Sequence, residues 1–322
     1  MPMEAIRLSK EPVFRNITLQ VCERSDKQIL LTDFITSYLK KCHKNESYKQ
    51  MHLVCTKHLS SFAQLTGKQI YTDSMSEQMF EDFVYYLQEC KLMSSTVKGI
   101  VQRTKSMLQK AQNANYKVNN TYHDYNFRDD EIDSIFLTMA EITRIYYYKG
   151  LTRNQEEIRD YFIVGCLTGL RYSDYSRLTA ENFAEGKIQI RTKKTKTPVL
   201  IPMHRFVKEI IRKYNGTLPP ARCIQYFNLA IKEICKQVGL TELVAYERQI
   251  GFDFVRRMLP KWKLVSSHTA RRSAATNMFL AKIDTYRIML LTGHKTESAF
   301  FRYIKISREE NAMVLAGNQF FN

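Results

Sequence analysis

The sequence predicts a mainly α-helical protein of two domains that also contains one small antiparallel β-hairpin. Apolar residues recur at helical spacing over most of the 322 residues. One segment, KIQIRTKKTKTPVLIPM at 187–203, alternates with a period of two. A polar, asparagine-rich stretch at 118–131 separates the two periodic halves. We therefore expect an N-terminal tail at 1–24, a helical domain at 25–117, a linker at 118–131, and a second domain with a C-terminal tail at 132–322.

The first domain is expected to be a bundle of four helices with short connections. The first, TDFITSYLKKC, has Thr32 or Asp33 as its cap, and the second, MHLVCTKHLSSFAQL, stops at Gly67. The third is SEQMFEDFVYYLQEC, and the fourth is SSTVKGIVQRTKSMLQKAQNAN. The inward side chains of the third helix are expected to be Met79, Phe83, Tyr86 and Leu87. Ahead of the bundle, VFRNITLQVCE either pairs as a strand or forms a tail.

The second domain begins with two predicted helices, TMAEITRIYYYK and NQEEIRDYFIVGCLTGL, and Gly169 closes the second. The β-hairpin follows, because apolar residues alternate on both sides of a basic tip. Three further segments, HRFVKEIIRKYN, IQYFNLAIKEICKQVG and FDFVRRMLPKW, are expected to be mostly helical connections.

The net charge of +17 and the pI near 9.5 indicate a polyanionic partner, for which nucleic acid is the leading candidate. Residues 1–130 hold 18 basic and 14 acidic side chains, whereas residues 131–322 hold 31 and 18. The fourth helix is also distinctive, because no Asp or Glu lies between Lys91 and His123. Solvated helix faces usually mix both signs, so we expect this basic face to contact DNA.

Several classes of protein are excluded. No apolar run is long enough for a transmembrane helix, and the N-terminus lacks the apolar core of a signal peptide. The seven cysteines are scattered and form no CxxC, so they indicate reduced thiols of a cytoplasmic protein and neither a disulfide framework nor a zinc site.

The candidate chemistry is concentrated between Ser266 and Tyr303. His268 and Arg271 are three residues apart and share one helix face, and Ser266, Ser267 or Thr269 could cap that helix. A helix N-terminus favours a bound anion. A second apolar run ends at Gly293, followed by His294 and, nine residues later, Tyr303. Arginine, histidine and tyrosine without an acidic metal-binding cluster point to covalent chemistry on a phosphate.

Five pieces occur in a characteristic order: TGLRYSD, the basic hairpin, SHTARR, LTGH and Tyr303. In this the chain resembles the tyrosine recombinases, or phage-integrase family, and most closely the integrases of Bacteroides-type mobile elements. The resemblance covers residues 27–310, since the four-helix segment is similar to the family's SAM-like core-binding domain. It implies a two-domain DNA clamp, in which this helical domain is joined to a tyrosine-recombinase catalytic domain.

The resemblance also implies roles for individual residues. The catalytic residues that it implies are Arg171, Lys194, His268, Arg271, His294 and the nucleophile Tyr303, with Asp174 in support. Lys193 and Lys196 remain alternatives for the catalytic lysine. The expected DNA contacts are Lys98, Arg103, Lys105, Lys193, Lys196 and Arg272.

These residue types suit phosphoryl transfer. An arginine fork binds two phosphate oxygens and stays protonated, so two arginines could replace a divalent cation. We therefore expect no metal and no cofactor. A tyrosine hydroxyl has a reference pKa of about 10 and needs help to ionise. His268 could accept its proton, and Lys194 could protonate the departing 5′ oxygen. The product would be a 3′-phosphotyrosine bond that conserves the phosphodiester energy without ATP.

Taken singly, each of these residues has an ordinary structural explanation: His268 can start a helix, and Arg171 can end one. Taken together and in order, they favour a site-specific recombinase. The resemblance implies a homotetramer on double-stranded DNA sites, a Holliday-junction intermediate, accessory DNA-bending proteins, and a nucleoid-associated place in the bacterial cytoplasm. A non-cleaving DNA-binding regulator and a type IB topoisomerase are the alternatives. The DNA sequence, the direction of the reaction and the presence of an arm-binding domain stay open.

Overall fold

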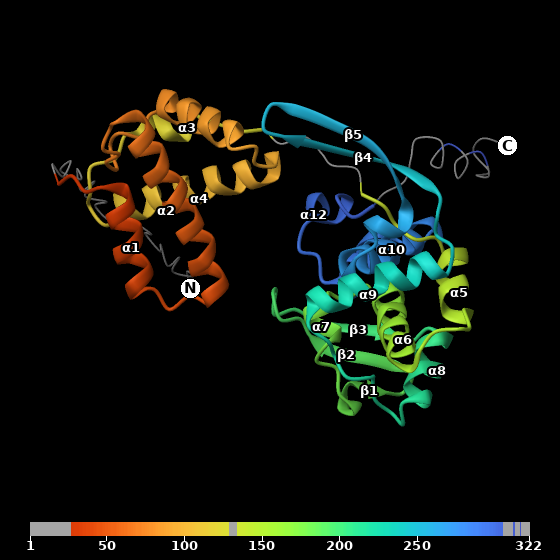
Figure 1. Ribbon diagram of the computed structural model, residues 1–322. Helices are drawn as coiled ribbons and strands as arrows, with labels where there is room; N and C mark the ends of the chain where they lie inside the picture. The colour runs from red at the N-terminus through yellow and green to blue at the C-terminus, as the bar shows by residue number, and fades with distance from the viewer. Residues whose placement is uncertain (1–26, 129–133, 305–311, 313–315, 317–322) are drawn as a thin grey trace, which may run out of the picture. The chain divides into compact units, whose positions relative to one another are not determined.

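The computed structural model describes residues 27–128, 134–304, 312 and 316, in two compact units. The first unit comprises residues 1–130 together with 249–253, and the second comprises 131–248 and 254–322 (Figure 1). The predicted tail at 1–24, including VFRNITLQVCE, and nearly all of the C-terminal tail lie outside the described residues.

The first unit is a helical bundle, as the sequence predicts. Its helices are α1 (Leu31–Lys41), α2 (Glu46–Thr66), α3 (Glu77–Glu89), α4 (Ser94–Asn113) and the short 3-10 helix η1 (Asn120–His123). Gly67 ends α2 in the left-handed conformation, as expected. The predicted cap of α1 at Thr32 or Asp33 is wrong, because the helix begins at Leu31 and its N-cap residue is Leu30, which makes no side-chain cap. Helix α3 buries Phe80 and Val84, whereas Met79 and Tyr86 are only half-buried.

The segment predicted as a linker, 118–131, is mostly part of this unit. Tyr122 is 1 % exposed, and Val118, Tyr125 and Phe127 pack against the same core. Thr121 Oγ1 accepts a hydrogen bond from the Glu77 N–H at 3.2 Å. The predicted linker is therefore wrong for residues 118–128. Burial of its aromatic side chains offsets the polarity of the surrounding residues.

Lys105 takes part in this packing. Its ammonium donates to the His123 carbonyl at 3.3 Å and also to the Tyr125 carbonyl. Partial burial lowers the pKa of Lys105. In this conformation two of the three donors of the ammonium secure the segment after α4.

In the second unit, other helices and a small sheet surround helix α6 (Figure 1). Its helices are α5 (Met139–Tyr147), α6 (Arg153–Thr168), α7 (Tyr172–Tyr175), α8 (Arg205–Lys213), α9 (Ile224–Gln237), α10 (Ser267–Leu280), α11 (Thr285–Thr292) and α12 (Glu297–Phe301), with 3-10 turns η2 (Ala180–Asn182) and η3 (Lys261–Leu264). Its antiparallel sheet has the order β1 (Phe183–Ala184), β2 (Lys187–Arg191) and β3 (Pro198–Pro202). Ile188 pairs with Ile201 and Ile190 with Val199, which confirms the predicted hairpin.

A second hairpin, β4 (Leu243–Ile250) and β5 (Asp253–Pro260), was not predicted. The expectation that FDFVRRMLPKW is a helical connection is wrong. Residues 254–259 read Phe-Val-Arg-Arg-Met-Leu, an order in pairs without alternation, and the segment is a strand because it pairs with β4. Arg256 also forms an ion pair with Glu247 at 3.0 Å, from β5 to β4.

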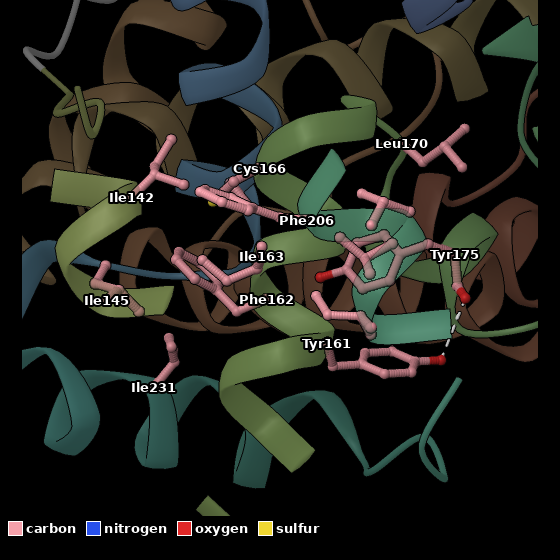
Figure 2. Packing of buried hydrophobic residues seen from close by; sticks show 14 of the residues in the cluster. Ile142, Ile145, Tyr161, Phe162, Ile163, Cys166, Leu170, Tyr175, Phe206 and Ile231 are labelled. Carbon is pink, nitrogen blue, oxygen red and sulfur yellow. Dashed lines mark hydrogen bonds between the residues drawn. The ribbon is translucent and has the colours of Figure 1, made fainter. Parts of the chain in front are cut away.

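Helix α6 is the centre of the second core, with apolar side chains on several sides (Figure 2). The labelled side chains around it include Ile142 and Ile145 of α5, Phe206 of α8, Ile231 of α9 and Tyr175 of α7. The Tyr161 hydroxyl donates to the Tyr175 carbonyl at 3.2 Å and links α6 to α7. In the described part of the chain, no helix is long and apolar enough to cross a membrane. This core is the support on which α7 and α10 present the polar residues described next.

Candidate active site

Arg171 is positioned by the end of α6. Gly169 ends that helix in the left-handed conformation (φ 67°), as predicted, and Arg171 then serves as the N-cap residue of α7. Its Nη1 atom is buried and has no hydrogen-bond partner among the residues that the structure describes. A buried cationic donor without a partner is costly, so this atom indicates a place for an anion.

The start of α10 positions His268. Of the three caps left open by the sequence, the structure selects Ser266, whose N–H donates to Thr269 Oγ1 at 3.0 Å. The Ser267 N–H donates to Asn228 Oδ1 at 2.8 Å, which ties the helix start to α9. His268 therefore lies in the first turn of α10, as expected.

Arg271 is almost completely buried, at 1 % exposure. Its Nη1 donates to the Gly169 carbonyl at 2.6 Å, and its Nη2 lies 2.9 Å from His294 Nε2. Its Nε is buried without a partner. Burial, followed by repulsion from Arg171, lowers the pKa of Arg271 to about 10, so the guanidinium stays charged at neutral pH. The two arginines thus offer two unpartnered buried donors.

His294 and Tyr303, which follow α10 in the sequence, both lie next to the Arg271 guanidinium. Gly293 ends α11 with φ 67°, as predicted, and His294 follows. The His294 and Tyr303 ring centroids are 4.9 Å apart, and the Arg271 guanidinium carbon lies 5.3 Å from the Tyr303 ring centroid. Thr276 Oγ1 donates to the Tyr303 carbonyl at 3.2 Å, which fixes this segment to α10.

Both histidines have a pKa below the ordinary value of the imidazole. Burial lowers the pKa of His294 to about 3, and Arg271 and Arg171 add to this. The pKa of His268 is lowered by burial and then by Arg272, Arg271, Arg171 and Lys194. A neutral His268 can accept a proton at neutral pH, as a general base must.

Asp174 connects α7 to the basic hairpin. It is fully buried, and its Oδ1 accepts the Lys193 N–H at 2.6 Å. Arg177 donates to the Arg191 carbonyl, and the hydroxyls of Thr192 and Thr195 lie 2.7 Å apart within the turn. The side chains of Lys193, Lys194 and Lys196 are exposed. Among these three lysines, Lys194 contributes to the lowered pKa of His268.

The predicted DNA contacts do not all join this site. Arg272 is partly buried, and its Nη1 donates to the Ile135 carbonyl at 2.7 Å, which gives it a structural contact. Lys98 and Arg103 belong to the first unit, where Arg103 Nη2 lies 3.1 Å from Met51 Sδ.

Sequence reasoning missed three participants: Thr292, Arg177 and the Gly169 carbonyl. Thr292 Oγ1 lies 2.7 Å from His294 Nδ1. Its place in LTGH, two residues before the histidine, was the one available signal. The Gly169 carbonyl and Arg177 act through contacts with the distant Arg271 and Arg191, which local patterns do not reveal.

The arrangement can hold a phosphate between two guanidinium groups, with an imidazole and a phenol beside it. Such a site stabilises charge on the non-bridging oxygens of a transferring phosphoryl group. Over residues 27–128 and 134–304, no group of three or more His, Cys, Asp or Glu side chains is placed to bind a metal ion.

Comparison with known proteins gives two family matches. The model described as "Phage integrase SAM-like domain" matches residues 30–128, and the model described as "Phage integrase family" matches residues 135–310. No curated protein matches the chain.

Solved structures show the same fold. A lambda integrase dimer bound to a COC′ core site is 14 % identical, with a TM-score of 0.65, over 86 % of this chain and 95 % of that one. The Tn1549 transposon integrase in complex with transposon right end DNA is 13 % identical, with a TM-score of 0.65, over 89 % and 98 %. A lambda integrase tetramer bound to a Holliday junction is 16 % identical, with a TM-score of 0.62, over 87 % and 79 %.

Proposed function

This chain belongs to the phage integrase family of tyrosine recombinases, which cleave and rejoin DNA, and on that premise we propose that it is a site-specific recombinase with Tyr303 as its nucleophile. The observation that carries the proposal is the convergence of Arg271, His294 and Tyr303. The buried, unpartnered donors on Arg171 and Arg271 support a scissile phosphate at that point.

In the proposed reaction, the Tyr303 hydroxyl oxygen attacks the phosphorus atom while the bond to the 5′ oxygen breaks. Neutral His268 takes the phenolic proton, and Lys194 gives a proton to the departing 5′ oxygen. The arginines stabilise the charge on the non-bridging oxygens. Attack by a 5′-hydroxyl of the partner strand then reverses these proton transfers and releases Tyr303. Each bond broken is replaced by one of the same kind, so the proposal requires neither metal nor ATP.

The proposed assembly is a homotetramer that exchanges strands through a Holliday junction. The likeness to the lambda integrase tetramer on such a junction supports it. We further propose a substrate on a mobile element of the Bacteroides type, from the resemblance of SHTARRSAATN and TGHKTESAFFRYIK, and action at the bacterial nucleoid with accessory DNA-bending proteins. The basic side chains Lys98 and Arg103 of α4, with Lys193 and Lys196 of the hairpin, are the proposed contacts to the DNA backbone.

The test compares wild-type protein with Tyr303→Phe on duplexes from the ends of candidate mobile elements, nicked near the cleavage point so that covalent product accumulates. Wild-type protein is expected to form a denaturation-resistant protein–DNA adduct. Tyr303→Phe should bind the DNA and form none. Tyr286→Phe is the matched control, since Tyr286 is 67 % exposed and lies on α11.

Three results would contradict the proposal. Cleavage that survives in Tyr303→Phe rules out the nucleophile. Tight binding by the wild type without any adduct identifies a non-cleaving regulator. Relaxation of supercoiled DNA without site preference or recombinant products identifies a topoisomerase.

A further inference from the structure

The hydroxyl of Thr292 lies between a backbone carbonyl and the imidazole of His294. Thr292 is fully buried in the last turn of α11. Its Oγ1 donates to the Ile288 carbonyl at 2.7 Å and lies 2.7 Å from His294 Nδ1. A hydroxyl has one hydrogen to donate. Since that hydrogen is on the Ile288 carbonyl, the hydrogen between Thr292 and His294 must come from Nδ1.

The other side of the ring leads to the same assignment independently. His294 Nε2 lies 2.9 Å from Arg271 Nη2, and a guanidinium nitrogen can only donate. Nε2 must therefore be the ring nitrogen that carries a lone pair. Both neighbours require the neutral tautomer with its hydrogen on Nδ1.

The geometry points to Thr292 as a positioning residue that fixes His294 in the Nδ1–H tautomer and aims the Nε2 lone pair at Arg271. Only the hydroxyl, and not the shape, of the threonine supplies this contact. Replacing Thr292 by valine would leave a buried Nδ1–H without an acceptor, a state that the other tautomer or a rotated ring would relieve.

The other groups around the imidazole reinforce this assignment. Arg271 of α10 and Arg171 before α7 are both cationic and lower the pKa of His294. The Tyr303 ring and the Phe300 ring lie against the imidazole with centroids 4.9 Å and 5.7 Å away. Among the hydrogen bonds of residues 27–128 and 134–304, none joins a carboxylate to His294, so Thr292 is the acceptor that orders the ring.

The consequence for catalysis rests on the proposed function. With Nδ1–H bound to Thr292, Nε2 can donate a hydrogen bond to the scissile phosphate only after it takes up a proton from solvent. Thr292 then continues to accept from Nδ1–H in the imidazolium. The same hydroxyl therefore orders the ring both before and after the phosphate arrives.

The test uses DNA-free, full-length protein labelled with 15N at histidine. Two-bond 1H–15N correlations distinguish a protonated ring nitrogen from one with a lone pair, and the missing signals of His294→Asn assign His294. We expect Nδ1–H in the wild type and in Thr292→Ser, which keeps the hydroxyl. In Thr292→Val we expect loss of the single Nδ1–H pattern.

Thr104→Val is the matched control. Thr104 is also fully buried and also donates to the carbonyl four residues earlier, Ile100, at 3.0 Å, but it belongs to the other unit. It should leave the His294 spectrum unchanged. On DNA, Thr292→Val should cleave about ten-fold more slowly, the size of one lost hydrogen bond to a charged group, whereas Thr292→Ser should stay within about two-fold of the wild type.

An Nε2–H tautomer in the wild type would overturn the proposal, and so would an unchanged Nδ1–H pattern in Thr292→Val. The spectra decide this without any cleavage. If the wild-type protein does not cut DNA, the proposed function is refuted. The role of Thr292 is then still tested by the tautomer of His294. If Thr292→Val does not fold, Thr292→Ala, which also lacks the hydroxyl, takes its place, with the same expected loss of the Nδ1–H pattern and the same contradicting result.

Discussion

Asp174→Asn tests whether the buried carboxylate places the catalytic lysine. Asp174 Oδ1 accepts the Lys193 N–H at 2.6 Å, and Lys194 is the next residue in the turn. Asparagine keeps the size and one acceptor but removes the charge. Asp174→Ala removes both. If the carboxylate holds the hairpin loop in place, both changes should slow the transfer of a proton from Lys194 to the departing 5′ oxygen.

The expected size follows from the bond that is lost. A hydrogen bond to a charged group contributes about 1.5–3 kcal/mol, and about 1.4 kcal/mol changes a rate ten-fold. Asp174→Ala should therefore slow cleavage by about ten- to a hundred-fold, with Asp174→Asn near the lower end. Because the Asp174 charge also raises the pKa of Arg271, a slower rate alone does not identify the lysine as the cause.

The assay that separates the two causes replaces the 5′ bridging oxygen of the scissile phosphate by sulfur. A thiolate leaving group is far less basic than an alkoxide and needs no general acid. Single-turnover cleavage of the sulfur substrate should be nearly restored in both Asp174 variants and in Lys194→Ala. Equal defects on the oxygen and sulfur substrates would refute the reasoning and assign Asp174 to the arginines.

Asp160→Asn is the control for this prediction. Asp160 is a buried carboxylate of the same unit, and it is bound by Arg159, Lys213 and Tyr214 away from the hairpin. Its loss should lower the unfolding free energy and leave the ratio of the two cleavage rates unchanged.

Three further predictions concern stability, pH and DNA affinity. Gly169→Ala should lower the unfolding free energy by about 1–2 kcal/mol, because alanine is strained at φ 67° and its Cβ would lie 3.0 Å from Thr292 Cγ2. An unchanged midpoint of urea unfolding would contradict this. His294 has a pKa near 6.5 in the unfolded chain and about 3 in the folded chain, so the unfolding free energy should fall as the pH drops below 6.5. Urea titrations between pH 7 and 4 should show a shallower decline in His294→Asn than in the wild type. Lys98→Gln and Arg103→Gln should each reduce the slope of log affinity against log salt by about one. Lys105→Gln should reduce that slope by less, because two of the three donors of its ammonium are bound to backbone carbonyls, and an equal loss in all three would contradict the assignment.

The positions of the candidate site residues at helix starts and ends were largely predictable, because local sequence patterns determine where a helix begins and ends. The spacing of His268 and Arg271, the glycine before His294 and the place of Gly169 all follow from helix geometry and helix ends. The β2–β3 hairpin followed from alternation with a period of two. These features depend on neighbours in the sequence, and the structure keeps each of them.

The errors arise where distant contacts decide. FDFVRRMLPKW contains enough apolar and charged residues to suit a helix, but pairing with β4 makes it a strand. The segment 118–128 is polar on average, yet Tyr122 is buried in the first core, and Val118, Tyr125 and Phe127 pack against it. Lys105 stays a predicted DNA contact, and its ammonium also meets carbonyls that no local pattern places there. The contact between Thr292 and His294 was missed for the opposite reason, since the two residues are close in the sequence, at the end of α11 and just after it, and the sequence gave no sign of their side-chain orientation.

The chemical identity of the covalent intermediate tests the central claim most directly. Wild-type protein trapped on nicked DNA would be digested with protease and nuclease, and the modified peptide sequenced by mass spectrometry. We predict a single adduct on Tyr303, joined to the 3′-phosphate of the nucleotide, and a free 5′-hydroxyl on the released strand. An adduct on another residue, or a linkage through a 5′-phosphate, would contradict the mechanism.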